Sequence, residues 1–216
     1  YVPEFYKIER GENDWFSGVT FRDDKVYYCV QGYDETKGVM SNKFAYRSFS
    51  DLNAENTIPL TFDVEGLEAC MNICCPDATG NLYAVWEAYE PWTEEMGYDD
   101  SGESHSYLVK YDSAGNQIFA QELSGAVFEN VKNEYIQNMT IAADGKIIIS
   151  TGSNFLIFNE DGSLSQNIPT GADWVDGMCV TDAGMILYVS YGMNGIELCE
   201  VNPSTGAKEK TYKNIP

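Results

Sequence analysis

The chain has 216 residues, of which 44% are hydrophobic, a fraction that suits a globular protein with a buried core. Its 34 acidic residues outnumber 13 basic ones and give a formal net charge of −21. This charge repels phosphate backbones and anionic lipid surfaces, so nucleic acid is not an expected partner. No apolar run approaches the roughly 20 residues of a membrane-spanning helix, so we expect no transmembrane segment in this chain.

One pattern recurs four times. An apolar strand leads to a turn with Asp and usually Gly, then to a second strand rich in β-branched or aromatic residues. A loop, a third strand, a second polar turn and a fourth strand follow. Asp, Asn and Gly suit such tight turns because they tolerate positive φ. The four units cover approximately residues 11–62, 68–123, 135–168 and 174–212.

The strands within these units are apolar throughout or alternate with a period of two, which favours strand over helix. In chain order, we predict strands at residues 15–21, 25–30, 43–49, 57–62, 71–75, 81–89, 107–111, 117–123, 139–143, 146–151, 155–158, 163–168, 177–181, 185–191, 196–201 and 207–212.

Four strands per unit and a repeat of roughly 40–60 residues are typical of β-propeller blades. We therefore predict an all-β chain that folds as a single propeller domain over residues 1–216. A β-sandwich is the alternative, but the two Asp/Gly turns in each unit argue against it. The four units either form a small ring that residues 1–9 close or belong to a larger ring, and we expect the larger ring. An incomplete ring exposes blade edges, through which we expect self-association.

The six cysteines include no C-x-x-C pair, so the spacing does not indicate a zinc or thioredoxin-type site. Cys74 and Cys75 are adjacent, so in a strand they should point to opposite faces. Cys179 and Cys199 fall on the first and third strands of one unit, about 9–10 Å apart, which is too far for a disulfide.

The longest loop between the second and third strands of a unit lies at residues 90–106. In a propeller, this loop opens on the same face as the links between blades. The face gathers carboxylates and aromatic rings, a composition that can hold sugars, cationic groups or Ca²⁺. An ordinary solvated loop is the simpler alternative. The predicted ligand-binding residues are Trp92, Glu94, Glu95, Tyr98, Asp99, Asp100, Trp174 and Asp176.

Catalysis has little support in the sequence. His105 is the single histidine and falls in the polar loop, so a Ser-His-Asp or Cys-His system would have to use it. Carboxylates are plentiful, but no spacing singles out a glycosidase pair. We predict no catalytic residue and lean against an enzyme. We expect no cofactor, with Ca²⁺ or another divalent ion as the alternative.

Residues 176–190, which begin Asp176-Gly-Met-Cys-Val-Thr-Asp-Ala-Gly, resemble one blade of the gluconolactonase-like propellers, together with Val201-Asn-Pro-Ser-Thr-Gly-Ala-Lys. The resemblance implies that Asp176 is a metal ligand at the central channel. Asn138, which begins Asn138-Met-Thr-Ile-Ala-Ala-Asp-Gly, similarly matches an Asn ligand of that family. The family's Glu near the N-terminus and its other Asn have no counterpart. A metal-dependent lactonase-type hydrolase is therefore the alternative function.

A second resemblance spans most of the chain. Tyr1-Val-Pro-Glu-Phe-Tyr, Val26-Tyr-Tyr, residues 73–86 and Tyr107-Leu-Val-Lys-Tyr-Asp resemble propeller regions of large exported lipoproteins from clostridia-like gut bacteria. Some of those carry an extracellular solute-binding domain of the ABC-transporter type. This likeness implies an extracellular or cell-surface protein whose propeller binds a small molecule, sugar or protein without catalysis. A structural scaffold for contacts between domains or subunits is a further alternative.

Overall fold

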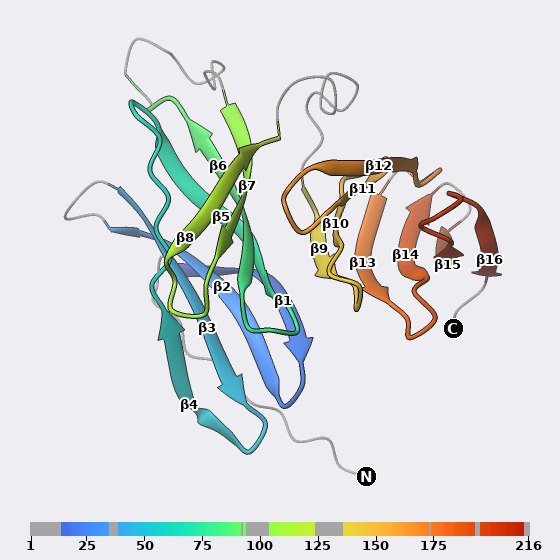
Figure 1. Ribbon diagram of the computed structural model, residues 1–216, viewed down its shortest axis with the longest axis horizontal. Helices are drawn as coiled ribbons and strands as arrows, with labels where there is room; N and C mark the ends of the chain where they lie inside the picture. Colours follow the sequence, from blue (N-terminus) through green and yellow to red (C-terminus); the bar gives the residue numbers. More distant parts are fainter. Residues whose placement is uncertain are drawn as a thin grey trace.

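The computed structural model describes residues 14–34, 39–91, 93, 104–123, 136–172, 174–192 and 195–213. Within these ranges every regular element is a β-strand (Figure 1). The strands are β1 (Asp14–Arg22), β2 (Lys25–Asp34), β3 (Val39–Ser48), β4 (Asp51–Ile58), β5 (Glu68–Pro76), β6 (Leu82–Tyr89), β7 (Ser104–Tyr111), β8 (Gln117–Glu122), β9 (Asn138–Ile141), β10 (Ile147–Ser150), β11 (Asn154–Phe158), β12 (Leu164–Pro169), β13 (Trp174–Val180), β14 (Ile186–Gly192), β15 (Gly195–Val201) and β16 (Lys208–Lys213).

The strands form four antiparallel sheets of four strands each, and every sheet keeps the order of the sequence. Blade 1 is β1–β4, blade 2 is β5–β8, blade 3 is β9–β12 and blade 4 is β13–β16. This arrangement confirms the prediction of an all-β propeller with four visible blades.

The first strand of each blade lies at the centre of the propeller. β1 packs on β5, β5 on β9, and β9 on β13. The end of β1 also reaches β9, where the Arg22 guanidinium donates to the carbonyl of Ile141 at 3.3 Å. No packing of comparable extent joins β13 to β1 within the described ranges. Figure 1 shows blade 4 at the opposite end of the molecule from blade 1. The four blades therefore form an arc.

Each blade has a front face, toward the next blade in the chain, and a rear face, toward the preceding one. Met71 and Trp86 of the rear face of blade 2 pack with Phe44 of blade 1. Tyr83 and Val85 of its front face pack with side chains of blade 3. A third core joins blades 3 and 4. Strands buried on both faces are apolar throughout, which explains runs such as the fully buried β10.

The faces also account for the cysteines. Cys74 lies in the core between blades 1 and 2, and Cys75 lies in the core between blades 2 and 3. The two side chains therefore point to opposite faces, as predicted. Cys179 is exposed and Cys199 is buried, and both are free thiols.

The repeated Asp holds the turn that joins two strands. Asp77 Oδ1 accepts from the backbone N–H groups of Thr79 at 2.8 Å and Asn81 at 2.9 Å, and Gly80 has a φ of +89°. The Asn81 side chain donates to Asp77 Oδ2 at 3.0 Å. Burial alone would raise the pKa of Asp77, but these hydrogen bonds lower it below its ordinary value. Asp77 therefore fixes this hairpin, and Asp112 makes the same bonds at the second turn of blade 2, whereas Thr181 takes this place in blade 4.

Five strands begin three or more residues earlier than predicted: β3, β4, β5, β7 and β13. β4 runs from Asp51 to Ile58, so the predicted strand at residues 57–62 was wrong beyond Ile58, and β7 starts at Ser104, which pairs with Tyr89. His105 is thus part of a paired strand and not of the loop. Separately, the described part of the chain contains no helix that is long and apolar enough to cross a membrane.

Candidate functional site

The candidate site lies at the end of the propeller where the inner strands begin, which we call the channel mouth. Three inner strands carry a β-bulge at corresponding positions, and in β1 the extra residue is Gly18. Asn72 is the extra residue of β5, and Asp176 is the extra residue of β13. Each bulge lies opposite the fourth and fifth residues of the second strand in its blade. Bulges re-aim side chains and are over-represented next to sites, so these two polar residues mark the mouth.

Around the β5 bulge, polar side chains form a connected chain. The Asn72 amide donates to Glu87 Oε2 at 3.3 Å, and the Cys70 thiol lies 3.8 Å from Asn72 Oδ1. From blade 1, the buried Gln31 amide donates to the Met71 carbonyl and to the Cys70 sulfur. Blade 1 therefore supports the bulge from behind and leaves Asn72 and Glu87 at the mouth.

At the other bulge, two side chains from the start of β9 hold the residue before Asp176. The Val175 N–H donates to Gln137 Oε1 at 3.1 Å, and the Asn138 amide donates to the Val175 carbonyl at 3.3 Å. Both backbone groups of Val175 are therefore fixed by blade 3. This arrangement sets the position of Asp176, whose side chain is exposed.

The electrostatic field at the mouth is negative. Burial and the neighbouring Glu87 raise the pKa of Cys70 to about 11. Burial, Cys70 and Glu68 raise the pKa of Tyr89 to about 12. Neither group ionises near neutral pH, so Cys70 is a poor nucleophile here. The mouth suits neutral polar or cationic ligands better than anions. No group of three or more His, Cys, Asp or Glu residues able to hold a metal occurs among the described residues.

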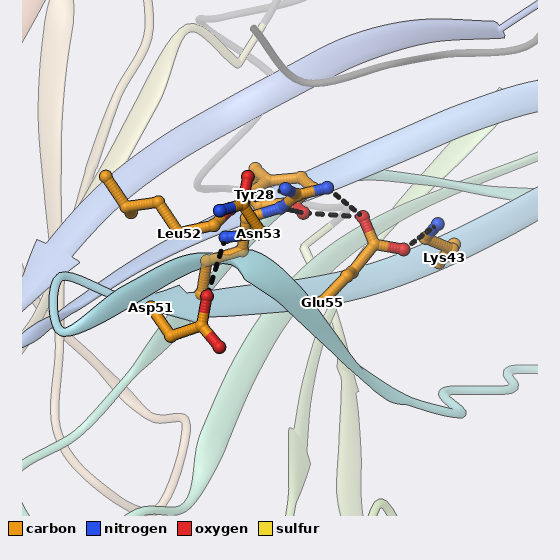
Figure 2. Close-up of polar contacts among 7 residues, drawn as sticks. Tyr28, Lys43, Asp51, Leu52, Asn53 and Glu55 are labelled. Carbon is orange, nitrogen blue, oxygen red and sulfur yellow. Dashed lines mark hydrogen bonds and ion pairs between the residues drawn. The ribbon is translucent and has the colours of Figure 1, made fainter. Parts of the chain in front are cut away.

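A second polar cluster lies on the rear face of blade 1 (Figure 2). Glu55 accepts from Tyr28 at 2.6 Å and pairs with Lys43 and Arg47. Arg47 also donates to the Leu52 carbonyl at 2.6 Å and to the Tyr28 hydroxyl at 2.8 Å. Partial burial alone would raise the pKa of Glu55, but the hydrogen bonds from Lys43 and Tyr28 lower it. The cluster ties β2, β3 and β4 together.

The structure brings together some of the predicted residues. Asn138 and Asp176 are joined through Val175, and Trp174 begins the same strand with 48% of its surface exposed. His105 pairs with Glu122 at 2.8 Å near the protein surface. The other predicted ligand-binding residues lie outside the described residues: Trp92, Glu94, Glu95, Tyr98, Asp99 and Asp100.

Sequence reasoning missed Asn72, Glu87 and Gln137. A bulge depends on the register between two strands, which no local pattern specifies. One signal was nevertheless present, because Asn72 interrupts an otherwise apolar strand between Met71 and Ile73. A polar residue inside an apolar inner strand marks a position that faces something other than the core.

No protein family and no curated protein matches the sequence. Among solved structures, a Bacteroides caccae protein of unknown function aligns with 96% of this chain at a TM-score of 0.55 and 11% identity. The chain covers 63% of that structure, less than two thirds of its length. The Dos1 propeller aligns with 93% of this chain, and the chain covers 64% of it, at a TM-score of 0.48 and 11% identity. A gluconolactonase-like propeller aligns with 91% of this chain, and the chain covers 77% of it, at a TM-score of 0.45 and 12% identity. At these identities the likeness concerns the fold alone.

Proposed function

We propose that this propeller is a non-catalytic binding domain of an exported, cell-surface bacterial lipoprotein, and that its ligand sits at the channel mouth. The observation that carries the proposal is that the extra residue is polar, Asn72 and Asp176, at two of the three corresponding bulges, whereas β1 carries Gly18 there. A rigid scaffold that presents polar side chains at one end of a channel is well suited to binding.

The chemistry of the mouth narrows the ligand class. The amides and carboxylates described above come from three blades, and the chain carries a formal charge of −21. A neutral sugar or a small cation fits this donor set, because carboxylates and amides accept hydrogen bonds from hydroxyl and ammonium groups. The exported location rests on the likeness to the lipoprotein propellers.

A thermal-shift panel tests the site with three named probes: neutral oligosaccharides, spermidine and Ca²⁺. A ligand at about 100 times its dissociation constant stabilises the folded state by about 2.7 kcal/mol, which raises Tm by roughly 5–10 °C for a domain of this size. Asp176→Ala and Asn72→Ala should abolish the shift. Asp182→Ala is the matched control, because Asp182 is exposed at the far end of β13. No shift with any probe, or shifts that survive both substitutions, would contradict the proposal.

The loop of blade 2 can be tested separately. Tyr89 and Ser104 are direct cross-strand partners, so residues 90–103 can be replaced by an Asn-Gly hairpin turn. We expect this variant to fold, since both strands keep their pairing, and to lose binding of the probe that shifts the intact protein. Unchanged binding would show that the loop does not bind the probe and that only the residues at the bulges do.

A metal-dependent lactonase is the second candidate, because Asn138 and Asp176 lie on adjoining strands and are joined through Val175. The Asn138 oxygen and the Asp176 carboxylate would hold the ion. Calorimetric titration with Ca²⁺ and hydrolysis of gluconolactone test it. Binding and turnover that both disappear in Asp176→Ala would support the lactonase, and a metal that binds without turnover would leave only the binding domain.

A further inference from the structure

The front face of blade 4 is apolar, and no other blade covers it within the described ranges. Cross-strand partners share a face of a sheet. One row across β13, β14 and β15 consists of Trp174, Tyr191 and Ile196, which are 48%, 40% and 47% exposed. The next row contains Val189, Leu198 and Tyr212. The third row ends in an ion pair between Glu200 and Lys210 at 3.2 Å.

The rear face of blade 1 is arranged in the same way. Its inner strand exposes Phe16, Val19 and Phe21, at 37%, 58% and 68%. Its outer strands carry the Glu55 cluster of Figure 2, with Glu55 between Lys43 and Arg47. Both faces thus expose apolar side chains on the inner strand and carry paired charges toward the rim, whereas Tyr28, Val30 and Ala45 in the middle of the blade 1 face are already buried.

Within the chain, the front face of one blade packs on the rear face of the next at three places, between blades 1 and 2, 2 and 3, and 3 and 4. The front face of blade 4 and the rear face of blade 1 are the same two kinds of face. In blade 2, Val85 and Leu108 of the front face are fully buried by blade 3. Val189 and Leu198 occupy the corresponding cross-strand pair of blade 4 and are only half-buried. Strands with two apolar faces are built to be covered on both, so the front face of blade 4 has the composition of an interface.

The tyrosines of the rear faces show what a neighbouring blade supplies. In blade 4, the Tyr188 hydroxyl donates to the carbonyl of Thr170 at the end of blade 3, at 3.0 Å. In blade 1, the Tyr28 hydroxyl donates instead to Glu55 of its own blade. Blade 1 therefore satisfies its polar groups internally, while its apolar inner strand stays exposed.

We propose that the front face of blade 4 packs on the rear face of blade 1 in a second copy of the chain, and that two copies close one ring through two such contacts. The contact joins different patches, so it is heterologous, and such contacts give a closed ring when the rotation closes. Two copies of four blades give eight, which lies within the range that propellers use. Each copy supplies the neighbour that the other copy's end blades lack.

Sedimentation velocity and light scattering on the 24.1 kDa chain test the proposal over about 1–100 µM. We expect a species of twice the chain mass. Ile196→Lys on blade 4 and Val19→Lys on blade 1 should each weaken association roughly 30-fold or more, since a charge enters an apolar contact. Ile118→Lys is the control, because Ile118 is 55% exposed on the outer strand of blade 2 and lies on neither face.

Mixing the two variants tests the pairing itself. The intact blade 4 face of Val19→Lys and the intact blade 1 face of Ile196→Lys should form a one-to-one pair, although each variant alone is monomeric. A wild-type monomer at all concentrations, open polymers, or a Val19→Lys variant that still dimerises would overturn the proposal. If a lysine variant loses its circular dichroism spectrum, Tyr191→Ser and Phe21→Ser take its place, at positions 40% and 68% exposed.

Discussion

Two glycines in blade 2 offer a matched test of how the turns pack. Gly80 and Gly115 both have a φ of +89° and both end an Asp-x-x-Gly turn. A Cβ at position 80 would meet its nearest atom, in Ser113, at 3.8 Å, which is ordinary contact. A Cβ at position 115 would lie 2.4 Å from the Pro59 carbonyl oxygen, where backbone must move.

The two alanine variants should therefore differ by the cost of this collision. Each pays about 1–2 kcal/mol for a left-handed non-glycine residue. Gly115→Ala pays about 1–3 kcal/mol more for overpacking against the link between blades 1 and 2. At about 2–4 °C per kcal/mol for a domain of this size, the extra cost is visible in Tm.

Urea unfolding followed by far-UV circular dichroism measures the difference in the free energy of unfolding between the two variants. Both curves are fitted with one shared value of m, the dependence of that free energy on urea concentration. Equal midpoints for Gly80→Ala and Gly115→Ala would show that residue 59 does not pack on the second turn, and the reasoning would fail. A larger loss for Gly80→Ala would refute it as well.

Other predictions concern buried ionisable groups. Asp77→Ala should cost about 2–3 kcal/mol in urea unfolding, because a buried carboxylate accepts four hydrogen bonds. Asp112→Ala should cost less, because Asp112 is only partly buried; equal losses would contradict this. The folded-state pKa of Glu55 is lowered, so its stabilisation is present above its unfolded pKa of about 4.3 and is lost as pH falls through the folded pKa. The stability gap between wild type and Glu55→Gln, measured by urea midpoints across pH, should therefore close in acid. In the Ile196→Lys variant, whose blade 4 face stays uncovered, exposed Cys179 should react with a thiol reagent in the native state, whereas burial raises the pKa of Cys74 and should delay its reaction until unfolding.

The sequence predicted the repeat because turn chemistry is local. Asp77 and Gly80 mark a hairpin through hydrogen bonds and a backbone angle that involve only their own neighbours. The inner strands were equally visible, since burial on two faces leaves an apolar run. These signals need no knowledge of which blade lies beside which.

Outer strands and the site were harder to predict. Most of β4 was missed because five of its eight residues are polar, with only Leu52, Ala54 and Ile58 apolar, and the strand is largely exposed. Hydrophobic periodicity reports burial, so an exposed edge strand gives little signal. The bulges at Asn72 and Asp176 depend on cross-strand register. The hydrogen bonds of Gln137 and Asn138 to the Val175 backbone join residues nearly forty positions apart. Such non-local contacts cannot be derived from local patterns.

The channel mouth and the uncovered faces are separate surfaces that meet at Trp174. Its ring lies in the first row of the blade 4 face, opposite Tyr191, while Asp176 lies two residues further along the same strand. A second copy on blade 4 would cover Trp174. The indole ring of Trp174 would therefore lie in the contact between copies and also beside the channel mouth. Loss of ligand binding in a Trp174 variant would therefore have two causes. Ile196, which shares the row but is two strands from the bulge, separates them, since its substitution disturbs association alone.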